Sequence, residues 1–189
     1  MVLNRSDLST HDCVDQLLEI FDQCFYLKYN TRLVRGESEP VYLAANDQCD
    51  YHQIVFSHGY FSSALHEVAH WCVAGASRRT LDDYGYWYVP DGRNAQQQQQ
   101  FEQVEVKPQA LEWIFSVAAD VPFRVSIDNL SGQCVDSKPF MTAVLKQVNH
   151  YCDQGLPVRA GYFRDALASY FTCGKLLNKQ SFKLNDLLL

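Results

Sequence analysis

His66-Glu67-Val68-Ala69-His70 places two histidines four residues apart, with a glutamate beside the first. On a helix, residues at this spacing share one face, so both imidazoles point the same way and can bind one metal ion. The neighbouring residues are compatible with a helix that runs from about Gly59 to a stop at Gly75. The spacing therefore predicts a metal site in the middle of a helix, with His66 and His70 as ligands and Glu67 one residue round the turn.

The composition is typical of one globular domain. The chain has 189 residues, of which 47% are hydrophobic, and this is long enough for one well-buried core but short for two. A net charge of −6 and the lack of a long basic run argue against nucleic-acid binding. No stretch reaches the length of a transmembrane helix, and residues 1–7 do not resemble a signal peptide. We expect a single domain over residues 1–189, located in the cytoplasm, with neither nucleic acid nor membrane as a partner.

The cysteines support this compartment. There are seven, an odd number, and none forms a Cys-x-x-Cys pair. Scattered thiols in a chain without a secretion signal are typical of a reducing cytosol, and they indicate neither a disulfide framework nor a zinc ribbon.

The hydrophobic pattern predicts an α+β fold, mainly helical, with a small sheet beside a zincin-like metal helix. Besides the metal helix, helical periodicity is found at residues 14–25, 101–118, 140–152 and 162–171. Short β-prone pieces occur at residues 30–34, 41–45, 53–56 and, more weakly, 123–127. Pro108 is expected to kink or split the third helix, and the glutamines 96–100 are expected to form its exposed first turns.

A metal held by two histidines needs a further protein ligand. The extended zincin pattern would require Gly at position 73 and His at position 76, but the chain has Val73 and Ala76. The alternative is a carboxylate from a later helix, where Glu102 and Glu105 lie three residues apart on the face opposite Phe101 and Val104. We expect Glu105 to be the ligand and Glu102 to lie near the site without binding the metal.

Two histidines and one carboxylate leave the chemistry open. With zinc and a bound water the set forms a hydrolase site, in which Glu67 is the general base. With Fe(II) it leaves three positions for dioxygen and substrate, as in oxygenases. The spacing alone favours a zinc metallopeptidase, because no histidine is followed two residues later by aspartate as in the usual iron-oxygenase motif. A third possibility is a non-catalytic binding module with a structural metal.

A wider set of motifs resembles the bacterial elongation factor P hydroxylase family. The resemblance runs from the first helix to about Phe171. It is carried by residues 30–33 (NTRL), 54–59 (IVFSHG), 64–72 (ALHEVAHWC), 84–88 (YGYWY), 90–93 (PDGR) and 101–113 (FEQVEVKPQALEW). It implies a non-haem iron monooxygenase on a zincin-like scaffold, with dioxygen as co-substrate. The protein substrate would be elongation factor P, hydroxylated on one lysine after β-lysine has been attached to it.

The resemblance also assigns roles to residues. His66 and His70 carry over as ligands of Fe(II), and Glu105 as the third ligand; zinc can occupy the same ligands in purified protein. Glu67 would orient a water or dioxygen species, or hold the substrate amine. A long cationic substrate needs aromatic faces and carboxylates, and Gly85 and Gly92 would let the loop turn close to the site. The predicted substrate-binding residues are Tyr86, Trp87, Asp91, Arg93 and Glu102.

Overall fold

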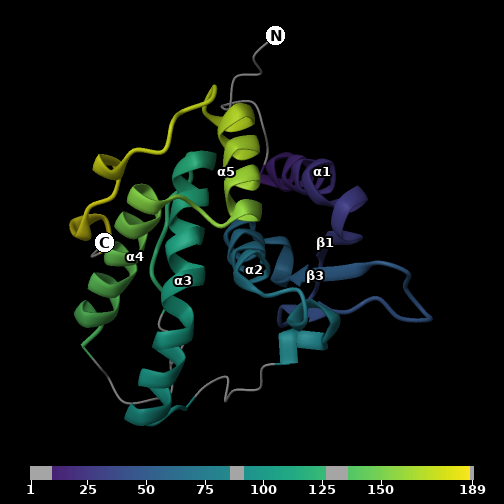
Figure 1. The fold of residues 1–189 in the computed structure, drawn as a ribbon, viewed down its shortest axis with the longest axis horizontal. Coiled ribbons are helices and arrows are strands. Elements are labelled where there is room, and N and C mark those ends of the chain that lie inside the picture. The colour runs from purple at the N-terminus through teal and green to yellow at the C-terminus, as the bar shows by residue number, and fades with distance from the viewer. Residues whose placement is uncertain (1–9, 86–91, 127–135, 188–189) are drawn as a thin grey trace. The chain divides into compact units, whose positions relative to one another are not determined.

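The computed structural model describes residues 10–85, 92–126 and 136–187, and the chain forms two compact units, Met1–Gly85 and Tyr86–Leu189 (Figure 1). The first unit contains a small sheet and two helices: α1 (Thr10–Tyr29), β1 (Thr31–Arg35), β2 (Val41–Leu43), β3 (His52–Phe56) and α2 (Phe61–Val73). The second contains α3 (Ala95–Ala119), α4 (Lys138–Gln154) and α5 (Val158–Phe171). The α+β, mainly helical fold is confirmed, whereas one domain over residues 1–189 stays a prediction.

The sheet of the first unit is mixed, with strand order β1-β3-β2. β1 pairs parallel to β3 with Leu33 opposite Ile54, and β2 pairs antiparallel to β3 with Tyr42 opposite Ile54. All three side chains are buried, so the alternating pattern of the strands turns one face toward the core. The three β-prone pieces at residues 30–34, 41–45 and 53–56 are therefore confirmed as strands.

Helix α2 carries both histidines and is fixed in the first unit by aromatic packing. Trp71 is fully buried, and its ring centroid lies 5.5 Å from that of Phe21, 4.8 Å from that of Phe25 and 5.3 Å from that of Tyr29, all on α1. Aromatic pairs at these separations add to the stabilisation that burial provides. Because this packing prevents α2 from rotating about its axis, it also fixes the direction of the histidine face.

The second unit is built on α3, against which α4 and α5 pack (Figure 1). Asn94 caps α3 in a capping box with Gln97, so that the glutamine run begins the helix as expected. Gln98, however, is only 3% exposed, which corrects the expectation that the whole run faces solvent. Its buried side chain is hydrogen-bonded to the side chains of Arg93 and Glu102.

Pro108 does not split α3, contrary to one of the two outcomes expected from the sequence. The helix runs without interruption from Ala95 to Ala119, with Pro108 inside it and buried. A proline in a helix interior costs roughly 3 kcal/mol, through a lost hydrogen bond and a steric clash. The apolar residues that follow, Leu111, Ile114 and Phe115, are each no more than 1% exposed. Their burial outweighs that cost, at about 1.5–3 kcal/mol for each large side chain.

The weak strand expected at residues 123–127 is not formed. Residues 123–126 have no strand partner, and Ile127 lies outside the described residues. Instead the backbone of Ser126 binds the side-chain amide of Gln109 on α3. A side chain thus satisfies the backbone groups that a sheet would otherwise pair.

The described residues show no disulfide bond and no helix suited to a membrane. All six described cysteines, at positions 13, 24, 49, 72, 152 and 173, are free thiols. Within the same ranges, no helix combines the length and the apolar character needed to cross a membrane.

Candidate metal centre

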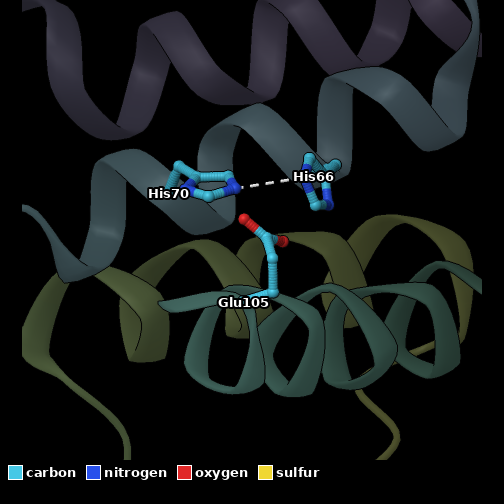
Figure 2. Close-up of side chains that lie close together, drawn as sticks. All are labelled: His66, His70 and Glu105. Carbon is cyan, nitrogen blue, oxygen red and sulfur yellow. Dashed lines mark hydrogen bonds between the residues drawn. The ribbon is translucent and has the colours of Figure 1, made fainter. Parts of the chain in front are cut away.

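His66 and His70 lie on adjacent turns of α2, and their Nε2 atoms are 3.1 Å apart (Figure 2). Their ring centroids are 4.7 Å apart at an interplanar angle of 69°. Both side chains are half-buried, whereas Leu65, Val68 and Ala69 of the same helix are fully buried. The apolar side of α2 is therefore held in the core, and the polar side presents two nitrogen donors to a common point.

This spacing fits two ligands of one metal ion. Histidine nitrogens bind such metals at about 2.0–2.1 Å, so two of them at roughly a right angle are about 3 Å apart. Metal binding requires a lone pair on both Nε2 atoms, which places the ring proton of each histidine on Nδ1. The same two atoms hydrogen-bond to each other when one of them is protonated instead. The metal-binding and the hydrogen-bonded arrangements of the pair thus differ in which ring nitrogen carries a proton.

Glu105 supplies the third donor of the cluster. It belongs to α3 and is only 3% exposed. Ligand atoms of His66, His70 and Glu105 all lie within 4.8 Å of one another, which makes the three a possible metal site (Figure 2). Glu102, the alternative carboxylate in the sequence, is not a member of this cluster.

The faces of α3 differ from those expected. Val104 was assigned to the apolar side, but it is 48% exposed, while Glu105 is buried. A single exposed valine is common on protein surfaces, so Val104 is a poor guide to the buried face. A buried carboxylate carries more information, because it needs a compensating partner such as a metal ion or hydrogen-bond donors.

Gln109 is the partner of Glu105 that sequence analysis missed. It is 1% exposed, and its Nε2 atom donates to Oε2 of Glu105 at 3.4 Å and to the Ser126 carbonyl oxygen at 2.7 Å. The backbone N–H of Ser126 donates to its Oε1 atom at 3.1 Å. Gln109 is one helical turn after Glu105, and this spacing is the only signal in the sequence that links the two.

Replacing Gln109 with methionine keeps most of the side-chain volume but removes these three hydrogen bonds. We expect the free energy of unfolding to fall by about 2–3 kcal/mol, because the backbone groups of Ser126 lose their partners. We also expect metal affinity to weaken about 10-fold, since groups that orient ligands contribute about 10–100-fold. Denaturant titration and metal titration of the folded protein measure the two effects. Gln103→Met, at an exposed position of the same helix, should change neither.

Arg93 and Glu102, two of the predicted substrate-binding residues, are linked through Gln98. The Arg93 guanidinium is buried over the ring of Phe101, with its central carbon 3.8 Å from the ring centroid. Its Nε atom donates to Oε1 of Gln98 at 3.0 Å, and the Gln98 amide donates to Oε1 of Glu102 at 3.2 Å. Arg93 therefore acts on the Glu102 carboxylate indirectly. The other three predicted residues, Tyr86, Trp87 and Asp91, lie outside the described residues.

Glu67 follows His66 on α2 and is half-buried. Burial is the largest cause that raises the pKa of Tyr84 well above its ordinary value, and the negative charge of Glu67 raises it further. Glu67 is not a member of the cluster formed by His66, His70 and Glu105. Glu67 thus lies next to His66 along α2 and outside the set of possible ligands.

A His-Glu-x-x-His pair on a helix, together with one carboxylate, is the donor set of mononuclear metal-dependent enzymes. Comparison with known proteins narrows this class to one family. The family described as elongation factor P hydroxylase matches residues 20–182. A protein of Haemophilus influenzae, elongation factor P lysine hydroxylase, is 51% identical over 169 residues, which cover 89% of this chain and 95% of that protein. The chain therefore belongs to the elongation factor P hydroxylase family.

Proposed function

We propose that this chain hydroxylates a lysine side chain of elongation factor P, with a metal ion held by His66, His70 and Glu105. The observation that carries the proposal is the cluster of these three side chains in a chain of this family. The name of the Haemophilus influenzae relative gives the substrate and the residue type that is modified. Such an enzyme acts on a cytoplasmic translation factor, and a cytoplasmic location follows from the proposal.

The donor set fits Fe(II). Two neutral imidazoles and one carboxylate would hold a mononuclear iron, and the iron would supply the dioxygen activation needed to hydroxylate a C–H bond. Glu105 is buried and both histidines are half-buried, so these ligands are partly shielded from bulk water. Zinc binds the same ligand types, so zinc in the purified protein is compatible with iron as the working metal.

The proposed substrate side chain is long and positively charged, and carboxylates and aromatic rings are the groups that bind it best. We assign this role to Glu102, Asp91, Tyr86 and Trp87, with Glu67 on the side of the metal. Arg93 is given another role, because a guanidinium repels a cationic amine. Its contacts with Gln98 and Phe101 support a part in holding Glu102 in place.

Glu67→Gln separates the proposed hydroxylase from a zinc peptidase. We expect the variant to keep its metal and at least about a tenth of the hydroxylation rate, because Glu67 is not a ligand. In a peptidase, loss of the general base lowers the rate about 10²–10⁴-fold. Wild type and variant should therefore be assayed side by side for oxygen addition to elongation factor P, with Fe(II), and for peptide cleavage, with Zn(II).

The outcome of that comparison is unambiguous. Cleavage by the zinc-loaded wild type that disappears in Glu67→Gln would contradict the proposal and favour the peptidase. Oxygen addition in both proteins, without cleavage in either, would support the hydroxylase. If the wild type binds elongation factor P but neither adds oxygen to it nor cleaves it, the protein is a binding module.

A further inference from the structure

Helix α3 carries a row of polar side chains along one face. Residues three and four apart on a helix are neighbours, so a 4-3-4-3-4 spacing forms a continuous row. The members of this row are Gln98, Glu102, Glu105, Gln109, Glu112 and Ser116. All of them are buried except Glu102, which is half-buried. Glu102 is therefore the member of the row that a molecule arriving from the solvent can reach.

The two carboxylates Glu102 and Glu105 are each held by a glutamine one turn away. The Gln98 amide donates to Oε1 of Glu102 at 3.2 Å. In the same way, Nε2 of Gln109 donates to Oε2 of Glu105 at 3.4 Å. Both glutamines are no more than 3% exposed. Gln109 supports the proposed metal ligand, and the same arrangement at Gln98 indicates that Glu102 also needs a fixed position.

Arg93 determines which end of the Gln98 amide faces Glu102. Its Nε atom donates to Oε1 of Gln98 at 3.0 Å. A guanidinium has donors only, so it cannot accept a hydrogen bond from an amide NH2 group. If the Gln98 amide were reversed, donor would face donor at Arg93 and acceptor would face acceptor at Glu102. The NH2 group of Gln98 is therefore directed at the Glu102 carboxylate.

Arg93 is itself fixed by its surroundings. It is 2% exposed, and the central carbon of its guanidinium lies 3.8 Å from the ring centroid of Phe101. A cation over an aromatic face is attracted to the ring, and this attraction is stronger away from water. The contacts from Phe101 through Arg93 and Gln98 thus begin in the buried interior and end at the half-buried Glu102.

We propose that Gln98 is a positioning residue that sets the affinity for the substrate: it holds one oxygen of Glu102, so that the other meets the cationic amine of the substrate side chain. The inference rests on the proposed function, in which Glu102 binds that amine. A carboxylate that is already held in one position loses less side-chain entropy when it binds a cation. Glu102 lies one turn before Glu105, so the amine binds beside the metal ligand without competing for it.

Gln98→Met tests this proposal, because it keeps most of the side-chain volume and removes both hydrogen bonds. Oxygen addition to elongation factor P should be measured over a range of factor concentrations, with Fe(II) and a reductant. We expect KM to rise about 5–10-fold, as for one weakened hydrogen bond to a charged group, and kcat to stay within about twofold. Metal affinity should also stay within about twofold, because Glu105 is held by Gln109 instead.

A double variant shows whether Gln98 acts through Glu102. In Glu102→Gln the carboxylate that Gln98 positions is absent, so the further change Gln98→Met should alter KM by no more than about twofold. Independent effects would multiply instead. Gln99→Met, at the exposed neighbouring position, is the matched control and should change neither KM nor kcat. If Gln98→Met does not fold, Gln98→Asn gives the same test, since its amide is one methylene too short to reach both neighbours.

Each outcome bears on one proposal. If KM rises in Glu102→Gln but not in Gln98→Met, the role of Gln98 is overturned and the proposed function stands. The role is also overturned if the two effects multiply, or if Gln98→Met loses its metal. Unchanged KM in both single variants would remove Glu102 from substrate binding, and the inference with it, but leave the hydroxylase. If the wild type adds no oxygen, the proposed function is wrong and the inference fails with it.

Discussion

His70→Ala is expected to abolish metal binding and to lower the hydroxylation rate by about 10³-fold or more. The Nε2 atom of His70 lies 3.1 Å from that of His66, so the two can bind one ion together. The histidine and the carboxylate that remain are too few ligands to hold a single metal ion. Because the proposed chemistry depends wholly on the metal, the loss of rate should follow the loss of metal. Metal content by elemental analysis and oxygen addition by mass spectrometry measure the two effects.

His150→Ala is the control for this experiment. His150 lies on α4 and is exposed, and it does not belong to the cluster of possible ligands. Its replacement should leave metal content and rate within about twofold of wild type, as is usual for surface substitutions. A His70→Ala protein that retains a full complement of metal would show that the ion is bound elsewhere.

Glu105→Gln is expected to weaken metal binding and to lower the hydroxylation rate, though less than His70→Ala does. The substitution keeps the shape of the side chain but replaces the carboxylate by a neutral amide. The negative charge that attracts a divalent cation is then lost. We expect metal affinity to fall about 100-fold or more, which corresponds to about 2.7 kcal/mol. Hydroxylation at limiting iron should fall by a similar factor. Competition titration against a chelator of known affinity measures the change.

Glu102→Gln is the matched control, since it makes the same change three residues earlier on α3. It should alter metal affinity by no more than about threefold and act mainly on KM for the cationic substrate. If Glu102→Gln weakens metal binding and Glu105→Gln does not, the two carboxylates have been assigned to the wrong roles.

The metal helix is the part of this protein that its sequence predicts best. Helical geometry alone places residues four apart on one face, so the spacing of His66 and His70 was sufficient to predict two adjacent ligands. The strands at β1, β2 and β3 were also predicted, because their side chains alternate between core and surface. In both cases a local periodicity carries the information.

Other features, which depend on particular tertiary contacts, were not predicted. The continuity of α3 through Pro108 depends on the burial of residues further along the helix. Gln109 accounts for two of them. Its side chain hydrogen-bonds to Glu105, and it also binds the backbone of Ser126, 17 residues later in the sequence, where a strand was expected. No local pattern distinguishes such a glutamine from an exposed one.

The types of the ligand residues did not decide which reaction the site catalyses. Two histidines and a carboxylate serve zinc hydrolysis and iron oxidation alike, and the spacing alone favoured the peptidase. The family decided for the hydroxylase, since motifs across most of the chain match it while His-Glu-x-x-His alone does not. Donor types limit the chemistry of a metal site, and its surroundings select among the options that remain.

The central claim is best tested by mass spectrometry of elongation factor P carrying β-lysine on its modified lysine. The factor should be incubated in air with this protein and a reductant, with Fe(II) in one sample and Zn(II) in the other. We expect one added oxygen atom on the modified lysine with iron and none with zinc. No added oxygen with either metal, or cleavage of the factor with zinc, would contradict the hydroxylase.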